Sequence, residues 1–228
     1  MSIRTAVAST FVAVSTLAMS AAAQGRDFTP YLIANRSTEI ALARTAAPKN
    51  ISDSATILVM TRKGLEEAVR GSNGFTCFVL RSFSAGLNDP GFWDPRGRAP
   101  HCLNAAATQS VLPGIRKRVE WVLAGRTTSE IATLTDRAYV TREFPVPAPG
   151  AMAYMTSHQQ MIGTPATHWM PHLMFYFDGN VPASIWGAGG FSAPVIDGSD
   201  DLPHPRVRTL LIPVRQWSDG TPAMSGTN

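Results

Sequence analysis

Two of the five histidines, His168 and His172, stand four residues apart at the start of an apolar segment. Met170 lies between them, and in an extended chain these three side chains share one face. Imidazole binds zinc, and thioether beside imidazole suits copper, so the pattern indicates a candidate metal site. On a straight strand the two histidines stand about 13 Å apart, too far for one ion. A bend at Met170 and Pro171 would bring them together, with His158 as a third ligand.

A hydrolase that uses the face of His168 and His172, with or without a metal, is one function that this pattern allows. The simpler interpretation has no cofactor: the histidines are hydrogen bonded at the mouth of a sheet, and the neighbouring aromatic side chains belong to the core.

The two cysteines allow two further interpretations. Cys102 precedes a helix that Asn104 can cap, where the helix dipole lowers the pKa of a thiol, and His172 would be its base. A cysteine before a helix and a later histidine resemble papain-like cell-wall peptidases in their order along the chain, although the local sequence of that family is missing around Cys102. The alternative is a disulfide between Cys77 and Cys102, which an oxidising compartment favours and which excludes a thiol enzyme.

Other catalytic motifs are missing from the sequence. It contains no Gly-x-Ser-x-Gly elbow of a serine hydrolase. The glycines from Gly187 to Gly190 do not follow the phosphate-loop pattern, and Asp197 to Asp201 lacks the closing glutamate of a calcium loop. These absences favour a non-catalytic binding or envelope-associated module, with the two kinds of hydrolase as alternatives.

The elements that must position these residues follow from periodicity and turn signals. Asn73-Gly74 is typical of a hairpin turn between two strands. The pattern predicts a helix at about 35–46, strands at 55–61, 65–70 and 75–82 in a three-strand meander, and an irregular stretch at 84–102. In the second half it predicts helices at about 104–125 and 127–138 and strands at 151–157, 173–177 and 206–214.

The two central helices carry a clear inner and outer side. Val111, Leu112 and Ile115 recur at helical spacing, and Thr127 with Glu130 forms a capping box before the second helix. Arg116, Lys117, Arg118 and Glu120 are expected on the outer, solvated side of the first helix. We predict an α+β fold of a single domain, a mainly antiparallel sheet with the two central helices packed on it.

The N-terminus predicts export. A positive start, an apolar run from Thr5 to Met19 and the small residues Ala21 to Ala23 are typical of a secretory signal peptide over residues 1–23. The run is about 15 residues long, short of the roughly 20 that span a bilayer. We expect one domain over residues 24–217, a loose C-terminal tail over 218–228, no transmembrane segment after cleavage, and a periplasmic or secreted location.

Composition limits the partners. The 228 residues are 44% hydrophobic, as in an ordinary globular protein, and the formal charge is +4. The basic residues are scattered, so we expect no nucleic-acid partner. The partner classes left open are a small molecule and a component of the cell envelope.

Several segments together resemble a group of exported bacterial proteins that are described only as hypothetical. The segments are Asn73 to Cys77, Phe92 to Pro95, Pro149 to Met155, His168 to Phe175 and Trp217 to Pro222. The resemblance spans most of the chain after the signal peptide. It implies a bacterial, exported, single-domain protein, and it brings no catalytic residue with it.

Overall fold

The computed structural model of the protein describes residues 26–163, 168–198 and 206–223. The predicted signal peptide, residues 1–23, lies outside the described residues. Within those ranges, no helix combines the length and the apolar character that crossing a lipid bilayer requires.

Eight strands form one sheet in the order β2-β1-β3-β4-β5-β6-β8-β7. Neighbouring strands are antiparallel except β1 and β3, which are parallel. The strands are β1 (Thr56–Thr61), β2 (Gly64–Val69), β3 (Thr76–Arg81), β4 (Arg98–Leu103), β5 (Met152–Met155), β6 (His172–Asp178), β7 (Ile196–Asp197) and β8 (Val207–Pro213). The predicted mainly antiparallel sheet is therefore present, and it is larger than the pattern indicated.

The predicted meander is wrong in its pairing. β2 returns along β1 from a tight turn between Thr61 and Gly64, and β3 lies on the other edge of β1. Gly74 does adopt the positive φ expected of it, at 79°. Its turn, however, crosses the end of β1: a Cβ on Gly71 would lie 2.2 Å from the backbone nitrogen of Thr56. That close approach admits only glycine and carries the chain past β1, so that it does not fold back on β2.

The predicted irregular stretch 84–102 ends in a central strand, β4. Pro100 argues against a central strand in the sequence, because proline has no N–H to donate to a neighbouring strand. β4 pairs with β5 only through Cys102 and Leu103, so the missing N–H of Pro100 falls outside that pairing. The chain therefore tolerates a proline in a strand that has neighbours on both sides.

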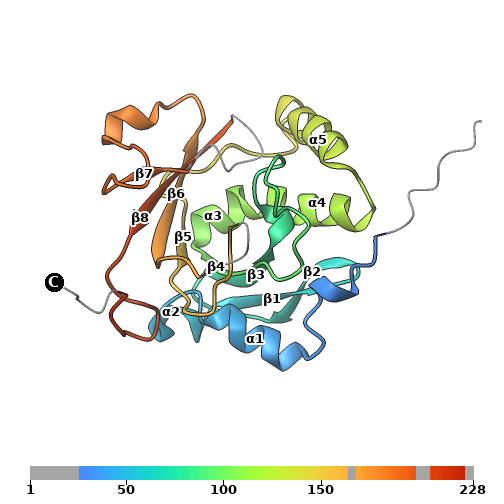
Figure 1. The fold of residues 1–228 in the computed structure, drawn as a ribbon, viewed down its shortest axis with the longest axis horizontal. Coiled ribbons are helices and arrows are strands. Elements are labelled where there is room, and N and C mark those ends of the chain that lie inside the picture. The colour runs from blue at the N-terminus through green and yellow to red at the C-terminus, as the bar shows by residue number, and fades with distance from the viewer. Residues whose placement is uncertain (1–25, 164–167, 199–205, 224–228) are drawn as a thin grey trace, which may run out of the picture.

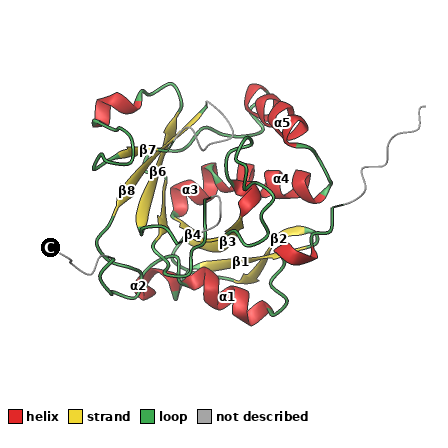
Figure 2. Cartoon of the chain, in the orientation of Figure 1, coloured by secondary structure: helices red, strands yellow, loops and turns green. Residues whose placement is uncertain are grey.

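Helices cover both faces of the sheet (Figure 1). The helices are α1 (Arg36–Arg44), α2 (Lys49–Ser52), α3 (Ala105–Ser110), α4 (Leu112–Leu123) and α5 (Thr128–Val140), with short 3-10 turns η1 (Thr29–Tyr31), η2 (Ser82–Ser84) and η3 (Ala183–Trp186). Figure 2 shows α1 and α2 on one side of β1 to β4, and α3, α4 and α5 grouped on the other. The α+β class is confirmed, but the helix cover differs from the expected pair, since α1 contacts β1, β3 and β4 while α5 contacts α4.

The helix starts follow their capping residues. The side chain of Asn35 accepts the N–H groups of Ser37 and Thr38, and that of Asn104 accepts the N–H of Ala107. Thr127 and Glu130 form the predicted capping box of α5. These local contacts satisfy backbone donors that a helix start leaves without partners.

Part of the predicted C-terminal tail makes backbone hydrogen bonds to the rest of the chain. The N–H of Ser218 donates to the carbonyl of Thr156, and the N–H of Ala223 donates to the carbonyl of Arg215. These bonds tie residues 218–223 to the end of β5 and to the chain that follows β8. Residues 224–228 of the predicted tail lie outside the described part.

The two faces of the sheet have separate cores. Under α1 the core is built from small residues and a disulfide, and it consists of Ala43, Ala46, Ala47, Ala55, Ile57, Cys77, Val79 and Cys102. The core on the other face is larger and more aromatic, and it includes Leu58, Phe78, Phe83, Phe92, Leu103, Val119, Val122, Ile131 and Tyr176. We call the first the α1 face and the second the α4 face.

Candidate ligand-binding cavity

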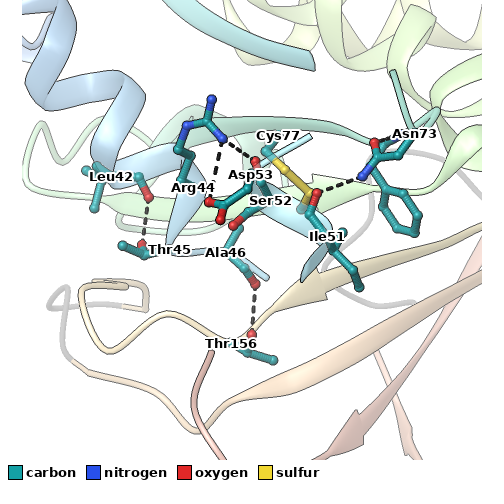
Figure 3. The surroundings of a disulfide bond; sticks show 12 residues. Leu42, Arg44, Thr45, Ala46, Ile51, Ser52, Asp53, Asn73, Cys77 and Thr156 are labelled. Atoms are coloured by element: carbon teal, nitrogen blue, oxygen red, sulfur yellow. Dashed lines mark hydrogen bonds and ion pairs between the residues drawn. A yellow bond between two sulfur atoms is a disulfide. The ribbon is translucent and has the colours of Figure 1, made fainter. Parts of the chain in front are cut away.

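The predicted disulfide between Cys77 and Cys102 is confirmed (Figure 3). The two cysteines are directly opposite each other on β3 and β4, and both are fully buried on the α1 face. Around them, Asn73 donates its side-chain N–H to the carbonyl of Ile51, and Thr156 donates its hydroxyl to the carbonyl of Ala46. The cross-link therefore sits in a closed region that hydrogen bonds hold from both sides.

The predicted thiol site of Cys102 and His172 is absent from this structure for two reasons. Cys102 is bonded to Cys77, so it offers no thiolate. In addition, Cys102 pairs with Tyr154, and Tyr154 with Leu173, so Cys102 shares its face with Leu173. His172, the neighbour of Leu173, points to the opposite face because strand side chains alternate.

The three histidines predicted as a metal set do not come together. His168 is exposed, whereas His172 is 1% exposed. His158 is exposed at another place, where its Nε2 lies 2.6 Å from the Thr221 hydroxyl and its ring stacks on Trp217 at 4.3 Å. Among the described residues, no three histidine, cysteine or acidic side chains are grouped so that they could hold a metal ion. The predicted zinc site is therefore not formed by these residues.

A different pair of histidines shares the α4 face. In the register that pairs Cys102 with Tyr154 and Met155 with His172, the side chains of His101, Met155 and His172 point to the same face. His101 and His172 are each 1% exposed. His101 was not predicted from the sequence as a site residue, although its place in a strand next to a buried Cys102 is a signal that it faces the opposite core.

These histidines line a cavity of about 510 Å³ on the α4 face. That volume lies within the range of small-molecule sites, roughly 300–1,000 Å³. The apolar residues that line it over the sheet are Leu80, Ala99, Met155, Met174, Val207 and Leu211. α4 and α5 supply Gly114, Ile115, Arg118, Thr135 and Tyr139, and the aromatic rings of Phe144, Trp169 and Phe191 complete the lining.

His172 presents a nitrogen lone pair without a partner. Its Nδ1 lies 2.9 Å from the carbonyl oxygen of Met170, and because a carbonyl only accepts, Nδ1 carries the proton. Nε2 is then an acceptor, and no described residue donates to it. Burial lowers the pKa of His172, and the bond to Met170 opposes that shift, so the imidazole is neutral at pH 7.

His101 is held neutral by its surroundings. Burial, together with the neighbouring His172, lowers the pKa of His101 to about 3. Its Nε2 lies 2.9 Å from the hydroxyl of Tyr176, whose pKa burial raises. The two imidazoles and the phenol therefore form an uncharged polar patch on the sheet side of the cavity.

Arg118 occupies the helical side of the cavity, contrary to the expectation that it lies on the solvated side of its helix. It is 6% exposed, and its position three residues after Ile115 and four before Val122 places it on the inner face of α4. Its Nε donates to the carbonyl of Phe83 at 2.8 Å, and its Nη2 donates to the carbonyl of Ala85. Its Nη1 has no acceptor among the described residues.

The cavity opens at an aromatic edge. The ring of Trp169 lies 5.3 Å from that of His172 and 5.7 Å from that of Phe191, measured between centroids. Phe191 is 68% exposed although it also lines the cavity, so it stands where the cavity meets the surface.

Comparisons with protein-family models, with curated proteins and with solved structures found no match to this chain.

Proposed function

We propose that the protein is an exported binding module that takes a small, largely apolar molecule into the cavity on the α4 face. The observation that carries this proposal is the cavity of about 510 Å³, whose exposed lining is mostly apolar and also carries polar side chains. Such a lining binds by burying apolar surface, at about 25 cal/mol per Å², while the polar groups fix orientation.

The uncharged state of the histidines supports this choice of ligand. Neutral His101 and His172 add hydrogen-bonding atoms to the wall without the charge that would oppose an apolar ligand. The thioethers of Met155 and Met174 adapt their shape to an occupant, since their side chains are unbranched. A small molecule or an apolar part of an envelope component fits this description.

We further propose that the protein is bacterial and periplasmic or secreted, like the exported hypothetical proteins that it resembles. The Cys77–Cys102 disulfide supports this location, because structural disulfides persist in oxidising compartments. Production in a bacterium with residues 1–23 in place, followed by fractionation and intact mass, tests it. A cytoplasmic, uncleaved chain would reject export without bearing on the cavity.

The binding function is tested with N-phenyl-1-naphthylamine, a neutral apolar dye that becomes fluorescent in apolar surroundings. We expect saturable binding of one dye per chain, and a weaker signal after Gly114→Leu. A Cβ on Gly114 would lie 3.7 Å from the Phe144 ring, an ordinary contact, so leucine enters the cavity wall without a backbone clash. Leucine also favours the helix over glycine, so stability should be kept while affinity falls about tenfold or more.

Thr133→Leu on the exposed side of α5 is the matched control, because it adds the same side chain outside the cavity. It should leave dye binding unchanged. Dye binding that Gly114→Leu does not weaken, or that both variants weaken equally, would place the apolar site elsewhere and reject the proposal.

The lone pair on Nε2 of His172 favours a second candidate, a hydrolase in which His172 is the base. His168, predicted to share its face, is exposed and is not needed here. His172→Asn keeps a donor for the Met170 carbonyl and removes the base. A hydrolase would lose turnover of p-nitrophenyl decanoate in this variant and still bind the dye. Equal, slow turnover by both forms would leave the binding module alone.

A further inference from the structure

Two buried arginines differ in how their charge is balanced. The Nη2 of Arg81 lies 2.7 Å from Oε1 of Glu39, and both side chains are 1% exposed. Arg118 is 6% exposed, yet it has no ion pair with an acidic side chain anywhere in the described ranges. Proteins rarely bury a charge without a partner, since desolvating an ion costs several kcal/mol.

The surroundings of Arg118 satisfy part of the guanidinium and leave its charge uncompensated. The carbonyls of Phe83 and Ala85 accept from Nε and Nη2, and the Phe92 ring centroid lies 5.4 Å from Cζ. Carbonyls and a ring stabilise a cation only in part, and burial lowers the pKa of Arg118 to about 10. The side chain therefore remains a cation at pH 7, with both N–H groups of Nη1 unused among the described residues.

The other charged side chains at the cavity are Arg81, Arg98, Asp89 and Asp94, and each has partners other than Arg118; Arg81 pairs with Glu39. Arg98 donates to the carbonyls of Pro95, Gly97 and Pro30. Asp94 pairs with Arg96 at 2.7 Å, and Asp89 accepts the N–H of Gly91. Because neither carboxylate is joined to Arg118, an anion that enters the cavity would meet a cation that is already desolvated.

We propose that the ligand of the cavity is an apolar carboxylic acid and that its carboxylate binds Arg118. This inference rests on the proposed binding function and specifies its ligand. The unused N–H groups of Nη1 can donate charge-assisted hydrogen bonds to a carboxylate, and one negative charge balances the one unpaired charge of Arg118. A doubly charged phosphate would leave a net negative charge in the same buried place.

The rest of the cavity fits the apolar body of such a molecule. Arg118 lies on α4, while Met174 and Leu211 line the wall on β6 and β8, on the far side of the sheet from β2. The ligand therefore places its charged end at α4 and its apolar part along the sheet toward Trp169 and Phe191. In that orientation the carboxylate is buried at Arg118, and the apolar part of the molecule contacts the aromatic rings of Trp169 and Phe191.

Decanoate and 1-decanol test the inference, because they share an apolar chain and differ in the charged group. Each is measured by displacement of the neutral dye at pH 7.5 and low salt. We expect the wild type to bind decanoate about 10- to 100-fold more tightly than 1-decanol, as charge-assisted hydrogen bonds in a dry site allow. Arg118→Gln should abolish that preference and keep the affinity for 1-decanol, whereas Arg118→Lys should retain part of it.

Arg116→Gln is the matched control on the same helix, since Arg116 donates to the carbonyl of Leu65 away from the cavity lining. It should keep the wild-type preference. If Arg118→Gln fails to fold, the wild type still decides: its preference for decanoate should fall as the pH is lowered through the pKa of the acid, while 1-decanol does not follow.

The outcomes separate the two proposals. Equal affinity of the wild type for decanoate and 1-decanol would overturn the carboxylate inference and leave the apolar binding function intact. A preference for decanoate that survives in Arg118→Gln would also overturn it, because another group would then hold the acid. No displacement of the dye by either molecule would reject the inference, and no dye binding at all would reject the binding function itself.

Discussion

The two faces of strands β3, β4 and β5 differ in how tightly they are packed. On the α1 face, alanines and the Cys77–Cys102 disulfide close the space between helix and sheet. On the α4 face, larger side chains leave a cavity of about 510 Å³. Because successive strand residues alternate, His101 belongs to the cavity and its neighbour Cys102 to the cross-link. One strand therefore cross-links the sheet with one side chain and lines the cavity with the next.

The two faces also differ in how the charge of a buried arginine is balanced. Arg81 belongs to a network in which Oε1 of Glu39 also accepts the N–H of Met60, so its charge is matched within the protein. Arg118 is surrounded by backbone carbonyls and an aromatic ring, and no acidic side chain among the described residues pairs with it. If the comparison is right, changes on the α1 face should alter stability most, and changes on the α4 face should alter binding most.

The largest effect is expected from breaking the ion pair. Arg81→Met leaves a buried carboxylate on Glu39 without its partner and should lower the free energy of unfolding by about 3–5 kcal/mol. Arg118→Met removes a charge that has no partner and should cost clearly less. Urea denaturation of both variants measures the difference, and Glu39→Leu combined with Arg81→Met should recover much of the loss. Equal losses at the two arginines would contradict the comparison.

The next largest effect is expected at the disulfide. Cys77 and Cys102 are 25 residues apart, and opening a loop of that length should cost about 3 kcal/mol. Cys77→Ala with Cys102→Ala should therefore lower the urea midpoint while dye affinity at 25 °C stays within about twofold. A loss of dye binding in a variant that remains folded would show that the two faces are not independent.

Acid should weaken the α4 face. Burial lowers the pKa of His101 from its ordinary value of 6.5 to about 3. Between these two pH values, His101 is protonated in the unfolded chain and neutral in the folded chain. Stability is then constant above about pH 6.5 and falls below it, by about 1.4 kcal/mol per pH unit for such a group. Unfolding in urea at a series of pH values measures the slope.

His101→Gln should reduce that slope, since glutamine does not titrate. His168→Gln, at an exposed position outside the cavity, is the matched control and should leave it in place. An acid slope that is the same in all three proteins would show that His101 is not kept neutral by the fold.

The smallest effect is expected at Tyr176. Tyr176→Phe removes the hydroxyl that lies 2.9 Å from Nε2 of His101 and should cost about 1 kcal/mol of stability. The cavity wall keeps its shape, so dye affinity should remain near the wild-type value. A cost that matches Arg81→Met would mean that the polar patch, like the ion pair, is a main support of the fold.

Local signals in the sequence predicted much of the frame. The capping residues Asn35, Asn104 and Thr127 indicated the helix starts, and the even number of cysteines in a chain predicted to be exported indicated the disulfide. These predictions succeed because each depends on contacts within a few residues or on a single pair. The α+β class follows from the order of the same elements.

Long-range contacts were not predictable in the same way. The pairing of β3 with β1 depends on the close passage at Gly71, which no local pattern reveals. Arg118 was expected on the solvated side together with Arg116 and Lys117, because a charged residue type usually indicates an exposed position. His101 was missed because Pro100 hid its strand. Arg118 and His101, whose positions were predicted wrongly, both line the cavity. They are polar and buried, whereas a buried core is recognised in a sequence by its apolar residues.

The position of the disulfide also determines what a cut in the chain would release. Arg96 lies between Cys77 and Cys102, in the connection from β3 to β4, and its side chain is 67% exposed. Trypsin cleavage after Arg96 would give two polypeptides that the cross-link still joins. In denaturing electrophoresis, such a nicked protein would run as one species without reductant and as two species with it. The disulfide alone would then hold the two fragments together covalently.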